Sequence, residues 1–231
     1  MKTKVIVSVL TIFSCYFLAA QSACSKYYPL EEGASFQYTN YNGKGKLEGK
    51  IDYNVTNVSN NGDTTTATME MKYQDRKGKE IMASDYDFTC EGDVVKIDFQ
   101  SLMNQQMMQQ FAAMEIDVTG TDIELPNNLS VGQELADANV SIAADMGGMT
   151  MNMNVETINR KVEKKEKVTT PAGDFDCVVI YSENKTKMPM MGSKIFPSRI
   201  WLAEGIGMVK QESFNPKGKL TSSMVLTELQ K

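Results

Sequence analysis

The chain has 231 residues, of which 24 are basic and 29 acidic, and it contains no histidine. The net charge of −5 at pH 7 disfavours nucleic acid and anionic lipid as partners, because both require a positive protein surface. The lack of histidine excludes Ser-His-Asp and Cys-His catalytic sites and removes the commonest metal ligand.

The first 20 residues have the features of a secretory signal peptide. Two lysines near the start precede an uncharged, mostly apolar run that ends at Ala20, and small and polar residues follow it. This run is shorter than the about 20 apolar residues that a membrane-spanning helix needs, and no later segment is long and apolar enough to provide one. We therefore expect residues 1–20 to be removed, and residues 21–231 to form a single β-rich domain without a transmembrane segment.

Export also determines how the cysteines are interpreted. Cys24, Cys90 and Cys177 remain after the leader, and an oxidising compartment predicts one disulfide and one remaining thiol. The sequence leaves all three pairings open, and Cys177 is equally well explained as a buried small hydrophobe.

Cys24 is also a candidate for lipid attachment. It follows two small residues, but Gln21 is polar where a lipobox normally carries an aliphatic residue. We therefore favour a soluble product that begins at Gln21. If Cys24 were lipidated instead, Cys90 and Cys177 would be the only intramolecular pair.

Short β-prone stretches separated by turn residues occupy the first half of the exported part. The turns are too short for a crossover helix, so consecutive antiparallel hairpins are expected. Ala67, Met69, Met71 and Tyr73 alternate with polar residues, which predicts a half-buried strand. The expected strands are Phe36–Thr39, Gly49–Val58, Thr64–Tyr73, Glu80–Thr89 and Val94–Phe99.

The segment Ser101–Met114 interrupts this pattern. Its apolar residues, including Leu102, Met107 and Phe111, fall mostly at helical spacings, and it has no glycine, proline or β-branched residue. We predict one short helix here, followed by a polar turn over Asp117–Asp122.

The β pattern then resumes and continues to the end of the chain. Together the segments predict a mainly β fold, an antiparallel sheet rolled into an open or closed barrel, with the short helix covering an end or an opening. The expected strands are Ala138–Ala144, Met149–Val162 continuing through Lys167, Cys177–Ser182, Arg199–Leu202, Ile206–Phe214 and Leu220–Leu229.

Three landmarks indicate a family. They are Cys24–Leu30 (CSKYYPL) with Gly33, Thr170–Cys177 (TPAGDFDC) and Trp201–Glu212 (WLAEGIGMVKQE). In order and spacing, along the whole exported length, they resemble the DUF3108-like (TapB) family of exported Bacteroidetes proteins. The resemblance implies a β-rich domain of the cell envelope with no established molecular role, and it implies no catalytic residues.

The residues themselves indicate no enzyme and no cofactor. A glycine-rich phosphate loop followed by Lys-Ser/Thr is missing. Acidic pairs such as Asp174 with Asp176, or Asp85 with Asp87, are typical of exposed turns and strand edges, so we predict neither glycan hydrolysis nor a metal site from them.

Methionine is the unusual component, with 17 in the chain. Met149, Met151 and Met153 alternate with polar residues, so a strand would place three thioethers on one face. Three explanations remain open: an ordinary core, a deformable apolar groove for a lipid, acyl chain or partner peptide, and a Cu(I) site without the usual histidine.

From these observations we predict a non-enzymatic protein of the periplasm or cell surface that binds an apolar ligand or another envelope protein. The alternative is a structural or assembly factor that uses a sheet edge or its acidic face. An internal cavity lined by methionines would favour binding, whereas a filled core with an exposed apolar edge would favour assembly. The candidate ligand-contact residues are Met149, Met151, Met153, Phe111 and Trp201.

Overall fold

The structure is a computed structural model that describes residues 24–98, 116–145, 150–188 and 192–231. All regular elements in these ranges are β-strands. The signal peptide predicted over residues 1–20 and the helix predicted over Ser101–Met114 both lie outside the described residues.

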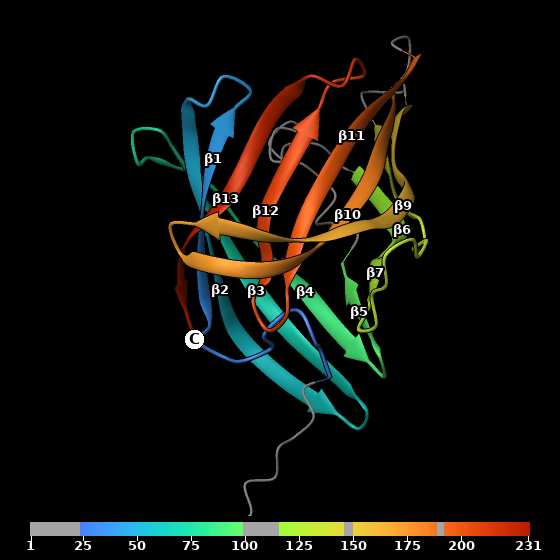
Figure 1. The fold of residues 1–231 in the computed structure, drawn as a ribbon. Coiled ribbons are helices and arrows are strands. Elements are labelled where there is room, and N and C mark those ends of the chain that lie inside the picture. Colours follow the sequence, from blue (N-terminus) through green and yellow to red (C-terminus); the bar gives the residue numbers. More distant parts are fainter. Residues whose placement is uncertain (1–23, 99–115, 146–149, 189–191) are drawn as a thin grey trace, which may run out of the picture.

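Thirteen strands form one antiparallel sheet (Figure 1). Each predicted strand range overlaps one of them. They are β1 (Ser35–Asn42), β2 (Leu47–Asn61), β3 (Thr64–Asp75), β4 (Glu80–Glu91), β5 (Val94–Ile97), β6 (Ile116–Thr121), β7 (Ile123–Pro126), β8 (Ala138–Asp145), β9 (Thr150–Thr170), β10 (Gly173–Met188), β11 (Gly192–Ala203), β12 (Gly207–Phe214) and β13 (Leu220–Gln230).

The strand order explains why the sheet is a nearly closed barrel, as predicted. It runs β6-β8-β9-β10-β11-β12-β13-β1-β2-β3-β4-β5-β7. The two end strands, β6 and β7, are separated in the chain only by Asp122. One continuous segment therefore pairs with β8 and then with β5, which brings both ends of the sheet together.

The prediction of a polar turn over Asp117–Asp122 was wrong. These residues form most of β6, which pairs with β8 along its whole length. Val118, Thr119 and Thr121 are β-branched and favour an extended backbone, whereas Asp117 occupies an exposed position of this end strand.

A buried arginine bridges the seam of the barrel. Arg160 of β9 is 3% exposed; its guanidinium donates to the carbonyl oxygens of Ala136 and, at 3.0 Å, of Glu124 in β7. Burial lowers the pKa of Arg160, although Asp137 and Glu124 oppose this effect. These charge-assisted hydrogen bonds satisfy carbonyl groups of two segments that no strand pairing joins.

The long hairpin of β9 and β10 bends over the outside of the sheet. Its pairing contains two register shifts, and Asn159 has a positive φ of 52°, so the strand changes direction near this point. In Figure 1 the end of the hairpin crosses in front of β11 and β12. Val168 and Phe175 pack there with Trp201 and Val209.

The main core fills the inside of the barrel. Alternate residues of the strands point inward, and neighbouring strands place these residues opposite one another. As predicted, β3 turns one apolar face inward: Ala67 is 1% and Met69 5% exposed. The core includes aromatic residues of β1 and β4 and aliphatic residues of β9 to β13, among them Phe36, Tyr38, Phe88, Val162, Ile180, Leu202 and Leu226.

Candidate ligand-binding site

Aromatic side chains from β1, β2, β4 and the N-terminal segment form a cluster inside the barrel. The rings of Tyr38 and Tyr53 lie 5.6 Å apart edge to face, and those of Tyr53 and Tyr86 lie 6.2 Å apart. Phe88 continues the row, with its ring centroid 5.4 Å from Tyr86 and 4.9 Å from Tyr28. Such arrangements stabilise aromatic pairs beyond simple burial.

These rings surround a cavity of about 60 Å³. This volume could hold a few water molecules or the end of a slender apolar group. It is well below the roughly 300 Å³ of an ordinary small-molecule pocket. The lining residues are Tyr28, Phe36, Tyr38, Tyr53, Met69, Tyr86, Phe88, Ile206 and Met208.

An apolar inner surface continues from the cavity toward one end of the barrel. In the strand register Tyr38 lies opposite Ile51 and Tyr53 lies opposite Met71. The next inward position, Tyr73, lies opposite Met82. Ile51, Met71, Tyr73 and Met82 are all half-buried. The small cavity is thus the closed end of a longer apolar surface, part of which reaches solvent.

The tyrosine hydroxyls of the cluster are neutral at physiological pH. Burial raises the pKa values of Tyr28, Tyr38, Tyr53 and Tyr86 above the usual value of about 10. Tyr38 donates a hydrogen bond to the Met208 carbonyl oxygen at 2.7 Å, and Tyr53 and Tyr86 are hydrogen-bonded to each other. These groups can orient a polar atom of a ligand, but they are poor general bases.

The methionines singled out from the sequence lie elsewhere. Met153 of β9 is 7% exposed and lies opposite Ile142 of β8. The backbone of Met151 belongs to the same strand, opposite Ala144, whereas Met149 and Phe111 lie outside the described residues. Met153 does not line the tyrosine cavity.

Met153 instead borders an open cleft of about 580 Å³ along β6, β8 and β9. The cleft is lined mainly by polar side chains of outward positions, including Ser141, Asn152 and Asn154. Asn154 Nδ2 donates to Ser141 Oγ at 2.9 Å, and the buried Asn154 Oδ1 has no hydrogen-bond partner among the described residues. Of the candidate ligand-contact residues, Met153 is the one found in the described lining of this cleft.

Trp201, the fifth candidate residue, lies on the opposite face of the sheet from the cavity. It is 4% exposed and packs with Cys177, Val179 and Val209 in a small core under the bent hairpin. Its neighbour in sequence, Leu202, belongs to the main core inside the barrel. Because successive strand residues point to opposite faces, Trp201 cannot line the same site as the tyrosines.

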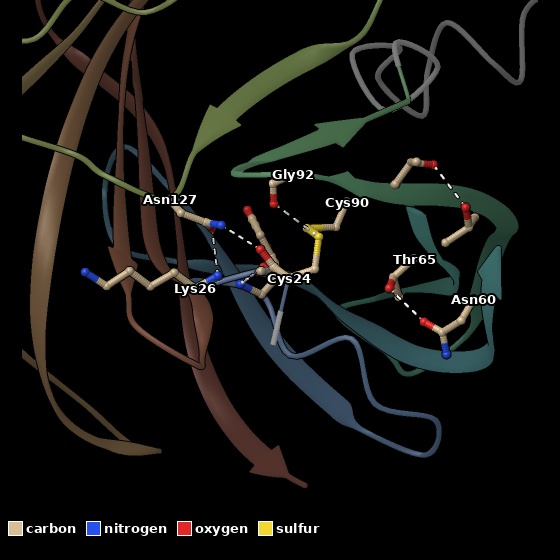
Figure 2. Close-up of a disulfide and its surroundings, with 11 residues drawn as sticks. Cys24, Lys26, Asn60, Thr65, Cys90, Gly92 and Asn127 are labelled. Atoms are coloured by element: carbon tan, nitrogen blue, oxygen red, sulfur yellow. Dashed lines mark hydrogen bonds between the residues drawn. A yellow bond between two sulfur atoms is a disulfide. The ribbon is translucent and has the colours of Figure 1, made fainter. Parts of the chain in front are cut away.

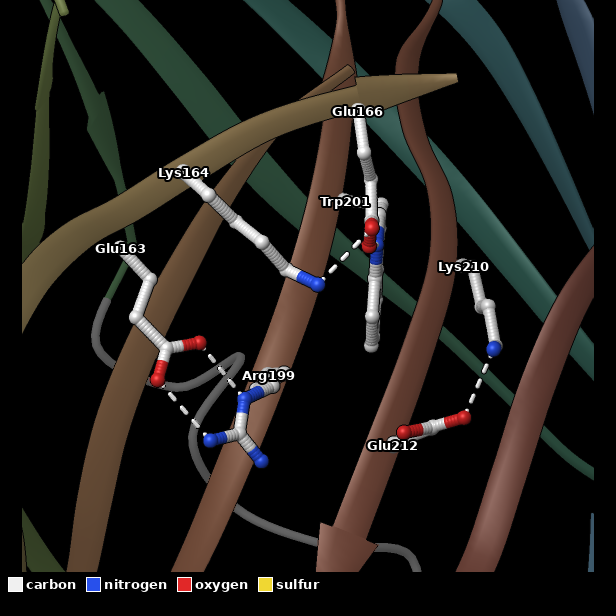
Figure 3. Close-up of polar contacts among 7 residues, drawn as sticks. All are labelled: Glu163, Lys164, Glu166, Arg199, Trp201, Lys210 and Glu212. Atoms are coloured by element: carbon white, nitrogen blue, oxygen red, sulfur yellow. Dashed lines mark hydrogen bonds and ion pairs between the residues drawn. The ribbon is translucent and has the colours of Figure 1, made fainter. Parts of the chain in front are cut away.

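Polar contacts fasten the hairpin over Trp201 (Figure 3). The indole Nε1 donates to Glu166 Oε1 at 2.6 Å, and Lys210 Nζ lies 4.6 Å from the ring centroid. Lys164, at 2.8 Å, and then the indole lower the pKa of Glu166. Close by, Arg199 makes two hydrogen bonds to Glu163, at 2.6 and 2.9 Å. The tryptophan of the third sequence landmark therefore has a structural role.

We expect Trp201→Phe to lower the free energy of unfolding by about 1–2 kcal/mol, because the ring is largely kept while one hydrogen bond to a charged group is lost. Urea unfolding of Trp201→Phe, Glu166→Ala and the double variant measures the coupling between the two side chains. A coupling energy close to zero would show that the indole–carboxylate bond does not hold the hairpin.

Cys24 forms a disulfide with Cys90, with a sulfur–sulfur distance of 2.07 Å (Figure 2). The bond ties the N-terminal segment to β4. Asn127 holds the same segment, since its Oδ1 accepts from the Lys26 N–H at 2.8 Å and its Nδ2 donates to the Cys24 carbonyl oxygen at 2.6 Å. Cys177 is a free, buried thiol, and burial raises its pKa to about 11. It is therefore protonated at neutral pH and is not an activated nucleophile.

Sequence reasoning missed the tyrosine cluster. The signal that could have found it is the alternation Phe36-x-Tyr38 and Tyr86-x-Phe88 in two strands expected to share one sheet, since alternate aromatic residues of neighbouring strands meet on one face.

The described ranges contain no group of three or more His, Cys, Asp or Glu side chains placed to hold a metal ion. Within the same ranges, no helix is long and apolar enough to cross a membrane.

The fold is shared with two solved bacterial structures. A Bacteroides fragilis protein, named as exported and YmcC-like in fold, superposes with a TM-score of 0.74 at 20% identity, covering 90% of this chain and 100% of its own. A Parabacteroides distasonis protein named as a lipoprotein gives 0.74 at 22% identity, covering 89% and 99%. No curated protein matches the sequence. The DUF3108-like family model matches residues 31–226, and the chain therefore belongs to the DUF3108-like family.

Proposed function

We propose that this protein is a non-enzymatic component of the cell envelope that binds an elongated apolar ligand, such as an acyl chain, inside its barrel. The observation that carries the proposal is the tyrosine-lined cavity and its continuation along the half-buried inner surface of Ile51, Met71 and Met82. The end of the ligand would occupy the cavity, and its remaining length would cover that inner surface. Methionine suits this task because its side chain adapts to irregular apolar shapes.

The chemistry of the cavity supports binding more than catalysis. Its hydroxyl groups belong to tyrosines whose raised pKa values keep them protonated, and the sequence offers no histidine. Tyrosine provides a large apolar surface with one polar end. The proposed role is therefore to hold a ligand without changing it.

Location in the envelope is proposed from the similar structures, which are named as an exported protein and a lipoprotein. The disulfide favours a form of this chain without a lipid anchor, because Cys24 Sγ is bonded to Cys90 and lipid attachment would need the same sulfur atom. The periplasm and the cell surface both fit this form.

The alternative role as an assembly factor that pairs through a sheet edge receives less support. The end strands β6 and β7 belong to one continuous segment, so their arrangement serves to close the barrel, and the Arg160 contacts to Glu124 and Ala136 occupy the seam beside β7.

The proposal is tested by filling the cavity. We expect Met69→Trp, which puts a larger side chain against the tyrosines, to weaken binding of dodecanoate at least tenfold by calorimetry, because the closed end of the site is then occupied. Native mass spectrometry of protein exported by a bacterial host should likewise show a co-purified apolar molecule in the wild type only.

Met153→Leu is the control, since it replaces a buried methionine that does not line the cavity, and we expect it to bind like the wild type. The proposal fails if folded Met69→Trp binds as the wild type does, or if the wild type neither carries an apolar molecule nor binds dodecanoate. Loss of binding in Met153→Leu alone would move the site to the β8–β9 side.

A further inference from the structure

Three hairpin turns of the barrel have the same unusual sequence. They are Asn42–Lys46 (NGKGK), Asp75–Lys79 (DRKGK) and Asn215–Lys219 (NPKGK). In each turn the side-chain Oδ1 of the first residue accepts hydrogen bonds from the backbone N–H groups of the third and fifth residues, at 2.8–3.1 Å. The three turns therefore share one pattern of side-chain to backbone hydrogen bonds.

The turn geometry accounts for only part of this sequence. The first residue must be Asn or Asp to accept the two bonds, and the fourth, with φ between 72° and 79°, favours glycine. Neither constraint involves the side chains of the third and fifth residues. All six of these positions are nevertheless lysine. Because the turn structure does not require lysine there, the repetition indicates that the positive charges have a function.

The topology places all three turns at one end of the barrel. They connect β1 to β2, β3 to β4, and β12 to β13, which are neighbours in the order β12-β13-β1-β2-β3-β4. Figure 1 shows the β1–β2 and β12–β13 turns at the top of the view and the β3–β4 turn at the upper left. Two of the turns touch, because a Cβ on Gly43 would lie only 2.2 Å from the Leu220 carbonyl oxygen.

We call these exposed basic side chains the basic rim. None of them forms an ion pair with a described residue. Three carboxylates lie nearby, those of Asp75, Glu48 and Glu80, and they are outnumbered by the basic side chains, so the rim is positive overall. The Asp75 carboxylate also accepts hydrogen bonds from backbone N–H groups of its own turn. The rim consists of Lys44, Lys46, Arg76, Lys77, Lys79, Lys217 and Lys219.

The turns at the opposite end of the barrel are acidic instead. They contain Asp63, Glu91, Asp93 and Glu204. Two of these carboxylates have lysine partners, Lys96 with Glu91 at 2.8 Å and Lys26 with Glu204 at 2.9 Å. The charges of the chain are thus separated along the barrel, a fact that the net charge of −5 conceals.

Exposed apolar side chains lie at the same end as the basic rim. Among the described residues four large hydrophobic side chains are strongly exposed, and three of them, Leu47 (43%), Ile81 (40%) and Ile195 (40%), lie near the starts of β2, β4 and β11. Each of these strand starts is at the rim end of the barrel. Lysines together with exposed apolar residues are the usual composition of a surface that lies on a membrane.

We propose that the basic rim docks on a bilayer surface of anionic, phosphate-bearing lipids. The lysines would lie among the head groups, while Leu47, Ile81 and Ile195 would enter the interface. The rim spreads over six neighbouring strands, which fits a laterally extended surface. The apolar residues favour a membrane over a soluble anionic polymer, since a polymer would leave them in water.

The test is sedimentation of the full exported protein with vesicles. We expect binding to vesicles of equal parts phosphatidylglycerol and phosphatidylcholine, much weaker binding to phosphatidylcholine alone, and weakening by salt. Each lysine near an anionic bilayer contributes about a fivefold factor to partitioning. Lys44→Glu with Lys217→Glu should therefore lower partitioning by at least tenfold.

Lys161→Glu with Lys231→Glu is the matched control, because both lysines are exposed away from the rim and the change in net charge is identical. It should retain most of the binding, and circular dichroism should show both variants folded. Equal losses in the two variants, or no vesicle binding by the wild type, would overturn the proposal. Binding to soluble polyphosphate without vesicle binding would overturn it in favour of a polymer partner. None of these outcomes depends on the dodecanoate experiment.

Discussion

Between pH 10 and pH 11 the free energy of unfolding is expected to fall by about 1 kcal/mol for each tyrosine of the cluster that the fold keeps protonated. Tyr28, Tyr38, Tyr53 and Tyr86 have pKa values raised by burial, whereas in the unfolded chain they titrate near pH 10. A raised folded pKa gives stability that is complete below pH 10. Above this pH the unfolded state loses protons that the folded state keeps, so stability falls as pH rises.

The measurement is the urea midpoint as a function of pH, together with the tyrosinate absorbance near 295 nm. Ionisation of the buried tyrosines should coincide with unfolding. Tyr86→Phe should reduce the loss between pH 10 and 11 by about 1 kcal/mol, because one titrating group is removed.

Phe88→Leu provides the control for this experiment. It changes a ring of the same cluster without removing a titrating proton, so it should lower stability at every pH and keep the same pH dependence. If Tyr86→Phe and Phe88→Leu show the same pH dependence, the tyrosines are not the cause of alkaline unfolding.

Loss of the disulfide has the second large expected effect. Cys24 and Cys90 are 66 residues apart, and closing a loop of this length stabilises the folded state by about 4 kcal/mol in the chain-entropy model. We expect Cys24→Ser with Cys90→Ser to lower the free energy of unfolding by about 2–4 kcal/mol in urea. A reductant should lower the wild type to the same value and leave the double variant unchanged.

Cys177→Ala is the control for the disulfide experiment, because this thiol is buried and unbridged. Its stability should still respond to reductant. Intact mass spectrometry adds an independent test, since lipid on Cys24 would add mass that a reductant does not remove. A lipidated Cys24, or a wild type indifferent to reductant, would contradict the pairing in the structure.

Much of the fold could be predicted because its determinants are local. Alternation in Thr66–Tyr73 and glycine turns every few residues are typical of hairpins, and hairpins of this number close into a barrel. The strand β6 was missed because the polar residues of Asp117–Asp122 resemble a turn, and only its pairing with β8 makes it a strand. Pairing between distant segments is not encoded in a local pattern.

The candidate site was less predictable than the fold. The row of Met149, Met151 and Met153 was visible in one strand, whereas the tyrosine cavity gathers residues of β1, β2, β4 and the N-terminal segment. Whether Trp201 points into or out of the barrel depends on the register of β11, which the local sequence does not give. The distribution of charge could not be predicted from the sequence either. The net charge of −5 disfavoured anionic lipid as a partner, but the strand order brings lysines of distant turns together at one end of the barrel.

The pairing of β1 with β13 has a consequence for how the protein matures. Phe36 lies opposite Leu229. The first strand, β1, can therefore pair with β2 early, but its pairing with β13 requires the last strand of the chain. Contacts between such distant residues form slowly because a long loop must close first. The barrel therefore cannot be completed before β13 is available, so its closure depends on the eleven residues Leu220–Gln230.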